Sequence, residues 1–95
     1  MIQKIPVTQY FKKENDILVD LREKTIFSFG TLHGAVNIPM SEIDKLYALP
    51  YDKNIVLFCQ HGDYSAEIAQ LLSDNGFHVT DLTGGYMEWL LHCAK

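Results

Sequence analysis

Cysteine is scarce in this chain. Cys59 and Cys93 are the two cysteines among 95 residues, and they stand far apart. Two cysteines are too few for a disulfide framework or a structural zinc site, so we expect no metal and no cofactor. No apolar run reaches the roughly 18 residues that span a bilayer, and the N-terminus lacks the apolar stretch of a signal peptide. We therefore expect a reduced, cytoplasmic protein without a membrane partner.

Positive charge is also scarce. Eight Lys and Arg stand against twelve Asp and Glu, which gives a formal net charge of −4. The sequence has no basic stripe, so nucleic acid is not expected as a partner. A small anionic substrate would gain nothing from the overall field and would have to be held locally. The apolar fraction of 47% is ordinary, and the length suits one domain over residues 1–95.

Strand and helix patterns alternate along the chain. Short strands are expected over residues 2–6, 17–20, 35–38, 55–59 and 79–82. Helical patterns are expected over residues 8–13, from Ser41, from Ser65 to a stop at Asn75-Gly76, and over 86–93. Such alternation predicts an α/β fold with a parallel sheet. Ligands of such sheets bind beyond the carboxyl ends of the strands, where Asp20 and Cys59 both lie.

Cys59 is the most informative position, because a buried strand ends there and a helix begins shortly after. A helix start carries unpaired N–H groups and partial positive charge, and both stabilise an anion. A cysteine becomes a nucleophile as its thiolate. Gly62 in the connecting loop indicates a close approach or a left-handed turn. The alternative is a buried structural cysteine, but the pattern favours a reactive-sulfur site.

Three stretches together resemble the signatures of single-domain rhodanese-like sulfurtransferases. They are Asp20-Leu21-Arg22-Glu23 with the later Asn37-Ile38-Pro39, then Cys59 to Ser65, and last Leu82-Thr83-Gly84-Gly85 with Trp89. The matches occur in the order of the family and cover nearly the whole chain. The resemblance implies a rhodanese-like α/β fold, in which helices flank both faces of a five-stranded parallel sheet.

The resemblance also implies a chemistry. Cys59 would accept a sulfane sulfur as a persulfide from thiosulfate, polysulfide or a persulfide-carrying protein, and would pass it to a thiol or to cyanide. The substrate-binding loop would comprise Gln60, His61, Gly62, Asp63, Tyr64 and Ser65. The supporting residues would be Asp20, Arg22, Gly84 and Gly85. Related phosphatases carry a loop one residue longer that ends in arginine, and this chain lacks both features.

The loop departs from the family pattern in its charge. Family members commonly carry arginine where this chain has Gln60 and Tyr64, and histidine where it has Thr31. Residues 59–64 include no Lys or Arg, and they include Asp63. The sulfur would then rest on backbone N–H groups alone. This predicts poor use of thiosulfate, a dianion, and favours polysulfide or a protein persulfide as the donor.

Each loop side chain has an expected role. Ser65 is expected to cap the following helix, although its hydroxyl also suits a hydrogen bond to the sulfur. His61 is expected to point outward to the pocket rim, and with Cys59 it makes a poor metal pair. Asp63 and Tyr64 are expected to line the mouth of the pocket.

The supporting residues also have expected places. Asp20 and Arg22 suit an ion pair that supports the loop, and Gly84-Gly85 suits a tight turn beside it. Trp89 is expected in the core. Cys93 lies on the apolar stripe of the last helix and is expected to be a buried structural thiol.

Other functions remain open at this point. The absence of arginine from the loop and the presence of Asp63 suit a catalytically weak or inactive rhodanese-fold module that binds or regulates a partner. A small thiol redox protein would require Cys59 and Cys93 to come within disulfide reach, with Cα atoms under about 7 Å apart. Phosphatase chemistry is disfavoured because the loop has no arginine.

Overall fold

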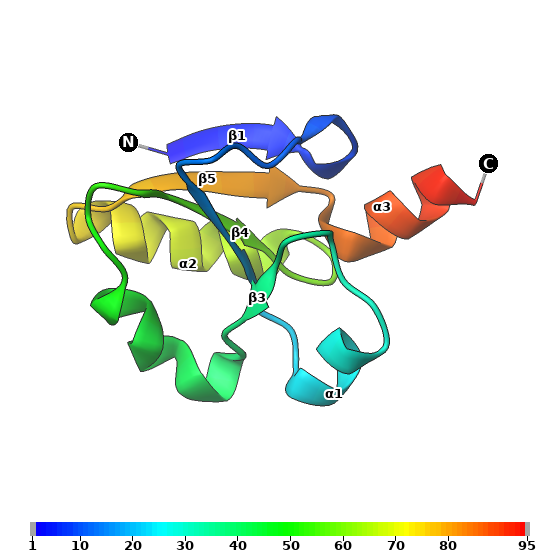
Figure 1. Ribbon diagram of the computed structural model, residues 1–95, viewed down its shortest axis with the longest axis horizontal. Coiled ribbons are helices and arrows are strands. Elements are labelled where there is room, and N and C mark those ends of the chain that lie inside the picture. Colours follow the sequence, from blue (N-terminus) through cyan, green and yellow to red (C-terminus); the bar gives the residue numbers. More distant parts are fainter. Residues whose placement is uncertain (1, 95) are drawn as a thin grey trace.

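A computed structural model describes residues 2–94 (Figure 1). The strands are β1 Ile2–Pro6, β2 Asp16–Asp20, β3 Val36–Asn37, β4 Asn54–Phe58 and β5 His78–Thr83. The α-helices are α1 Lys24–Ser28, α2 Asp63–Asp74 and α3 Gly85–Cys93, and the 3-10 helices are η1 Val7–Gln9 and η2 Met40–Ala48. The five strands form a parallel sheet in the order β1-β5-β4-β2-β3. The expected five-stranded parallel sheet is therefore confirmed.

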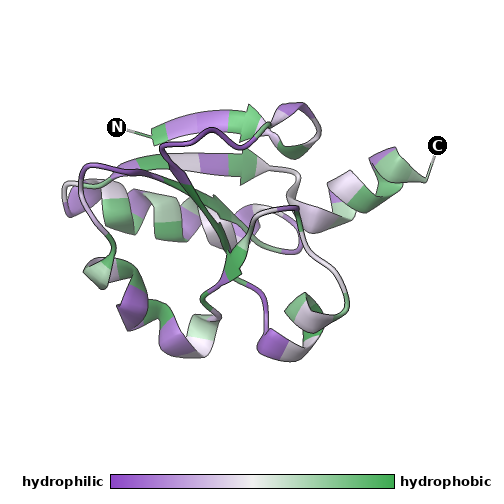
Figure 2. Cartoon of the chain, viewed as in Figure 1, coloured by the Kyte–Doolittle hydropathy of each residue, from purple (hydrophilic) through white to green (hydrophobic). Residues whose placement is uncertain are grey.

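Both faces of the sheet are covered. Successive side chains of a strand point to opposite faces, so Leu57 enters a core cluster with Ile68 of α2, while Phe58 joins a second cluster with Trp89 of α3. α2 packs along β5 (Figure 1), and hydrophobic and hydrophilic residues alternate around it (Figure 2). α3 packs against η1. β4 is buried between the two layers, which explains its unbroken apolar run.

Several local expectations are wrong. The helix expected over 8–13 is a single 3-10 turn, because Tyr10 is extended and the segment is held by tertiary contacts. The helix expected from Ser41 is a 3-10 helix that starts at Met40 and breaks at Glu42. α1 was not expected at all, because it is five residues long and buries none of them. None of the helices within residues 2–94 is both long and apolar enough to span a membrane.

Asp16 ties the segment before β2 to the sheet. Its carboxylate accepts hydrogen bonds from the Tyr10 hydroxyl at 2.7 Å, the Lys13 N–H at 3.1 Å and the Asn54 amide at 3.0 Å. Burial favours the neutral carboxyl, but these donors outweigh it and lower the pKa of Asp16 below its ordinary 3.8. The carboxylate therefore stabilises the fold at neutral pH.

Tyr10→Phe is expected to lower the free energy of unfolding by about 1–2 kcal/mol near neutral pH, because it removes a donor to a charged acceptor. A depressed folded-state pKa gives stability that is present above pH 3.8 and is lost as the pH falls through the folded-state value. The difference between wild type and variant should therefore shrink below pH 3.8. Urea titrations across pH measure it, with the exposed Tyr51→Phe as control. A difference that is constant with pH would contradict the bond to a charged carboxylate.

Candidate active site

Cys59 lies directly after β4 at the carboxyl edge of the sheet, with 5% of its surface exposed. The chain then turns at Gly62, whose φ of 99° is left-handed, and α2 begins at Asp63. This turn brings two backbone N–H groups to the sulfur. Those of Gly62 and Ser65 each donate to Sγ of Cys59 at 3.2 Å. Two N–H donors at the start of a helix suit a sulfur anion, either thiolate or persulfide.

Ser65 does not cap α2, so that expectation is wrong. The helix begins two residues earlier, with Gly62 as its N-cap, which places Ser65 in the first turn. There its backbone N–H has no partner within the helix and is free to bind the sulfur. Its hydroxyl donates to Oδ1 of Asp81 at 2.7 Å and lies 3.2 Å from the Gly62 carbonyl oxygen.

Asp81 is the residue of this site that the sequence did not reveal. It lies in β5, is fully buried, and also accepts a hydrogen bond from Nζ of Lys4 at 3.0 Å. A buried carboxylate needs such partners. The available signal was a charge inside the strand expected over residues 79–82. The Asp81 carboxylate fixes Ser65, and through it the N–H that faces Cys59.

Ser65→Ala is expected to lower the free energy of unfolding by about 1–3 kcal/mol, because it leaves a lone pair of a buried carboxylate unsatisfied. Urea unfolding measures the change. Ser41→Ala, at an exposed site, is the matched control and should change stability little. Equal effects of the two substitutions would contradict the bond between Ser65 and Asp81.

An ion pair between Asp20 and Arg22 lies next to the loop that follows Cys59. Arg22 donates to both carboxylate oxygens of Asp20, with Nη2 2.7 Å from Oδ2 and Nε 3.0 Å from Oδ1. Thr31 donates its hydroxyl to Oδ2 of the same carboxylate at 2.8 Å. Nη2 of Arg22 also donates to the Gly30 carbonyl at 2.6 Å, and Nη1 to Oε1 of Gln60 at 3.3 Å. The expected ion pair is present, and in it the carboxylate of Asp20 neutralises the positive charge of Arg22.

The turn at Gly84-Gly85 touches the sulfur loop from the other side. Both glycines are left-handed, with φ of 89° and 69°. The first N–H groups of α3 hold the loop backbone, since the N–H of Tyr86 donates to the Cys59 carbonyl at 2.9 Å. A Cβ on Gly85 would lie 2.6 Å from the carbonyl oxygen of Gln60 and 2.7 Å from that of Cys59. The two segments therefore meet without room for a side chain.

A cavity of about 390 Å³ opens over Cys59. Its lining includes Leu21, Arg22, Glu23, Ile26, Met40, Gln60, His61, Asp63 and Tyr64. His61 and Asp63 are exposed and Tyr64 is half-buried, as expected for the rim. Burial, together with the charges of Cys59 and Glu67, raises the pKa of Tyr64, so its hydroxyl stays protonated at neutral pH and can donate a hydrogen bond.

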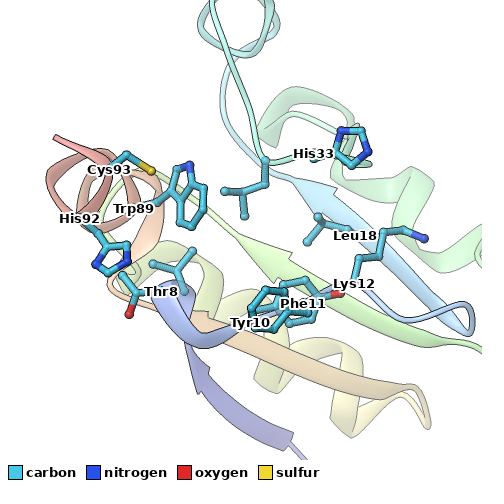
Figure 3. A pocket seen from close by; sticks show the side chains of 11 residues that line it. Thr8, Tyr10, Phe11, Lys12, Leu18, His33, Trp89, His92 and Cys93 are labelled. Carbon is cyan, nitrogen blue, oxygen red and sulfur yellow. The ribbon is translucent and has the colours of Figure 1, made fainter. Parts of the chain in front are cut away.

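A second, larger cavity of about 690 Å³ lies on the other face of the sheet, between α3 and the segment after β1 (Figure 3). Cys93 lines it and is exposed, so the expected buried thiol is wrong. The last turn of α3 is largely uncovered, and Leu91 beside it is also exposed. Trp89 is half-buried against the second core cluster.

The two thiols line different cavities on opposite faces of the sheet, and both are free. This placement counts against a thiol redox protein that joins Cys59 to Cys93. Within residues 2–94, no group of three or more His, Cys, Asp or Glu side chains is placed to hold a metal ion.

Sequence comparison connects this geometry to known proteins. The rhodanese-like domain matches residues 7–92 of the chain. The chain belongs to the rhodanese-like family. Among solved structures, a rhodanese-related protein of Thermoplasma volcanium resembles this rhodanese-like chain with a TM-score of 0.76 and 32% identity. That match covers 83% of this chain and 80% of the other.

Curated relatives of the rhodanese-like chain agree with this assignment. Uncharacterized protein YqhL of Bacillus subtilis is 36% identical over 74 residues, and the match covers 76% of this chain and 59% of YqhL. The chain thus spans less than two thirds of that relative. Putative sulfurtransferase YtwF of Bacillus subtilis is 34% identical over 73 residues, 76% of this chain and 71% of YtwF. Relatives named as sulfurtransferases support a sulfurtransferase-like function in general terms.

Proposed function

We propose that the chain transfers sulfane sulfur through a persulfide on Cys59. The observation that carries this proposal is the pair of N–H groups, from Gly62 and Ser65, that donate to Sγ of Cys59 at the start of α2. A cavity gives a small donor access to that sulfur. The donor is a polysulfide or a protein persulfide, and the acceptor is a thiol or cyanide.

The transfer has two displacement steps. The Cys59 thiolate attacks the sulfane sulfur of the donor; a new S–S bond forms on Sγ, the S–S bond of the donor breaks, and the remainder leaves as its anion. The acceptor thiolate or cyanide then attacks the outer sulfur of the persulfide. The bond between Sγ and the outer sulfur breaks. The acceptor leaves with that sulfur as a persulfide or as thiocyanate, and Cys59 is again a thiolate. The N–H groups of Gly62 and Ser65 stabilise the thiolate at Sγ before the first step and again after the second.

Charge around the cavity decides between donors. Thiosulfate carries its anionic sulfonate directly on the reacting sulfur. It therefore needs positively charged hydrogen-bond donors close to Cys59. Arg22 is the lining residue with a permanent positive charge, and Asp20 already neutralises it. Glu23 and Asp63 add negative charge to the lining. A persulfide or polysulfide chain has no oxyanion group at that point, and it fits this lining better.

Tyr64→Arg tests the donor preference by placing a cation where the family commonly has one. A charge-assisted bond of about 1.5–3 kcal/mol should raise kcat/KM for thiosulfate about tenfold or more, with little change for polysulfide. Thiocyanate formation measures both rates. Gln70→Arg, on the exposed side of α2, is the control for the added charge. Wild type using thiosulfate as well as polysulfide would contradict the donor preference.

A rhodanese-fold binding module remains the second candidate. The observation that favours it is that Glu23 and Asp63, which line the cavity and form no ion pair within residues 2–94, are both negative. This candidate expects no turnover above the uncatalysed rate with any donor, together with retained binding of a partner. Turnover of polysulfide by wild type would contradict the binding-module candidate.

A further inference from the structure

Exposed apolar side chains gather around the mouth of the Cys59 cavity. Ile26 and Met40 line that cavity, and each has about half of its surface exposed. A smaller cavity of about 290 Å³ adjoins it through Arg22, Ile26 and Gln60, and it is lined by the exposed Phe29 and Leu90. We call Ile26, Phe29, Met40 and Leu90 the apolar collar. A small sulfur donor would use the first cavity alone, so it would leave Phe29 and Leu90 of the collar uncovered.

The charges at this mouth are negative and unpaired. Glu23 and Asp63 both line the cavity and are exposed, and neither is in an ion pair within residues 2–94. Lys45 bonds to Glu42, and that bond, with the charges of Lys45 and Lys24, lowers the pKa of Glu42. A partner with positive charge would therefore be complementary to this mouth.

We propose that the apolar collar and the two carboxylates dock a protein segment in which the sulfur-carrying cysteine is flanked by basic and apolar residues. This inference rests on the proposed function, and it names the partner class of the same site. Basic residues of the segment would face Glu23 and Asp63, its apolar residues would cover the collar, and its cysteine would reach Cys59. The segment acts as donor when it carries the persulfide and as acceptor when it carries the thiol.

Peptides of equal length test the docking. Each holds one cysteine and the same apolar residues, flanked either by lysines or by glutamates. Wild type loaded with sulfur from polysulfide should transfer it to the basic peptide at least about tenfold faster than to the acidic one, and added salt should reduce the ratio. Asp63→Lys should reverse the preference, whereas Glu14→Lys, at an exposed turn before β2, changes the net charge equally and should not.

Two matched phenylalanines test the collar. Phe29 is 83% exposed beside the mouth, and Phe11 is 82% exposed at the second cavity. Phe29→Ser should slow transfer to the basic peptide several-fold while polysulfide uptake is unchanged, and Phe11→Ser should do neither. Cysteamine, a small cationic thiol without apolar residues, should accept sulfur more slowly than the basic peptide.

The outcomes separate this inference from the proposed function. Equal transfer to both peptides, or cysteamine as fast as the basic peptide, would overturn the docking surface while sulfur uptake by Cys59 stands. No loading of wild type by polysulfide would instead overturn the proposed function, and the docking inference with it.

Discussion

Cys59→Ser is expected to reduce the turnover of polysulfide to the uncatalysed level, a loss of about 10³-fold or more. An oxygen at this position cannot form a persulfide, and a serine hydroxyl is a weak nucleophile at neutral pH without an adjacent base. Serine is close in size to cysteine, and its oxygen can accept hydrogen bonds from the N–H groups of Gly62 and Ser65, so the fold should persist. Thiocyanate formation measures turnover, and circular dichroism checks the fold.

Cys93→Ser is the matched control for that loss. Cys93 is exposed and lines the cavity on the other face of the sheet, so its removal should leave the rate at the wild-type value. A Cys59→Ser protein that still turns over polysulfide, or a Cys93→Ser protein that does not, would contradict Cys59 as the reacting residue.

Gly85→Ala is expected to lower the free energy of unfolding by about 2–4 kcal/mol and to reduce turnover at least about tenfold. The added Cβ would lie 2.6 Å from the Gln60 carbonyl oxygen and 2.7 Å from that of Cys59. Both are backbone atoms, so relief requires the sulfur loop itself to move. The residue also has a φ of 69°, which disfavours any side chain. Urea unfolding and thiocyanate assays measure the two effects.

Gly76→Ala is the control that separates the two causes of the Gly85→Ala effect, which are the unfavourable backbone conformation and the collision of the added Cβ with the sulfur loop. Gly76 is also left-handed, with a φ of 90°, but a Cβ there would meet its nearest neighbour, Cε1 of Tyr51, at 3.8 Å. Gly76→Ala should lower the free energy of unfolding by about 1 kcal/mol, from backbone conformation alone. It should leave turnover unchanged. If Gly85→Ala has no larger effect than Gly76→Ala, the close contact between the Gly84-Gly85 turn and the loop is absent.

Local patterns predicted the parts of the site that depend on neighbours in sequence. The apolar run before Cys59 makes a strand that is covered on both faces, and Gly62 allows the left-handed turn that starts α2. The resemblance to the family adds Asp20 with Arg22 and the Gly84-Gly85 turn, which the structure brings against the same loop.

Tertiary contacts explain what the sequence did not reveal. Asp81 depends on Lys4 and Ser65, which lie 77 and 16 residues away, so no local pattern shows why a carboxylate is buried in β5. Cys93 follows the apolar stripe of α3, yet it is exposed because the end of that helix has little to cover it. Periodicity predicts which face of a helix is apolar, but it does not predict how far along the helix a partner extends.

The persulfide itself can be observed directly. Wild type is incubated with polysulfide without an acceptor, and its intact mass and the masses of its peptides are measured before and after a reducing agent. We expect a gain of one sulfur, about 32 Da, on the peptide that contains Cys59, and its loss on reduction. The Cys59→Ser variant should show no such gain. An unmodified Cys59 peptide, or a sulfur carried by Cys93 alone, would contradict Cys59 as the sulfur carrier.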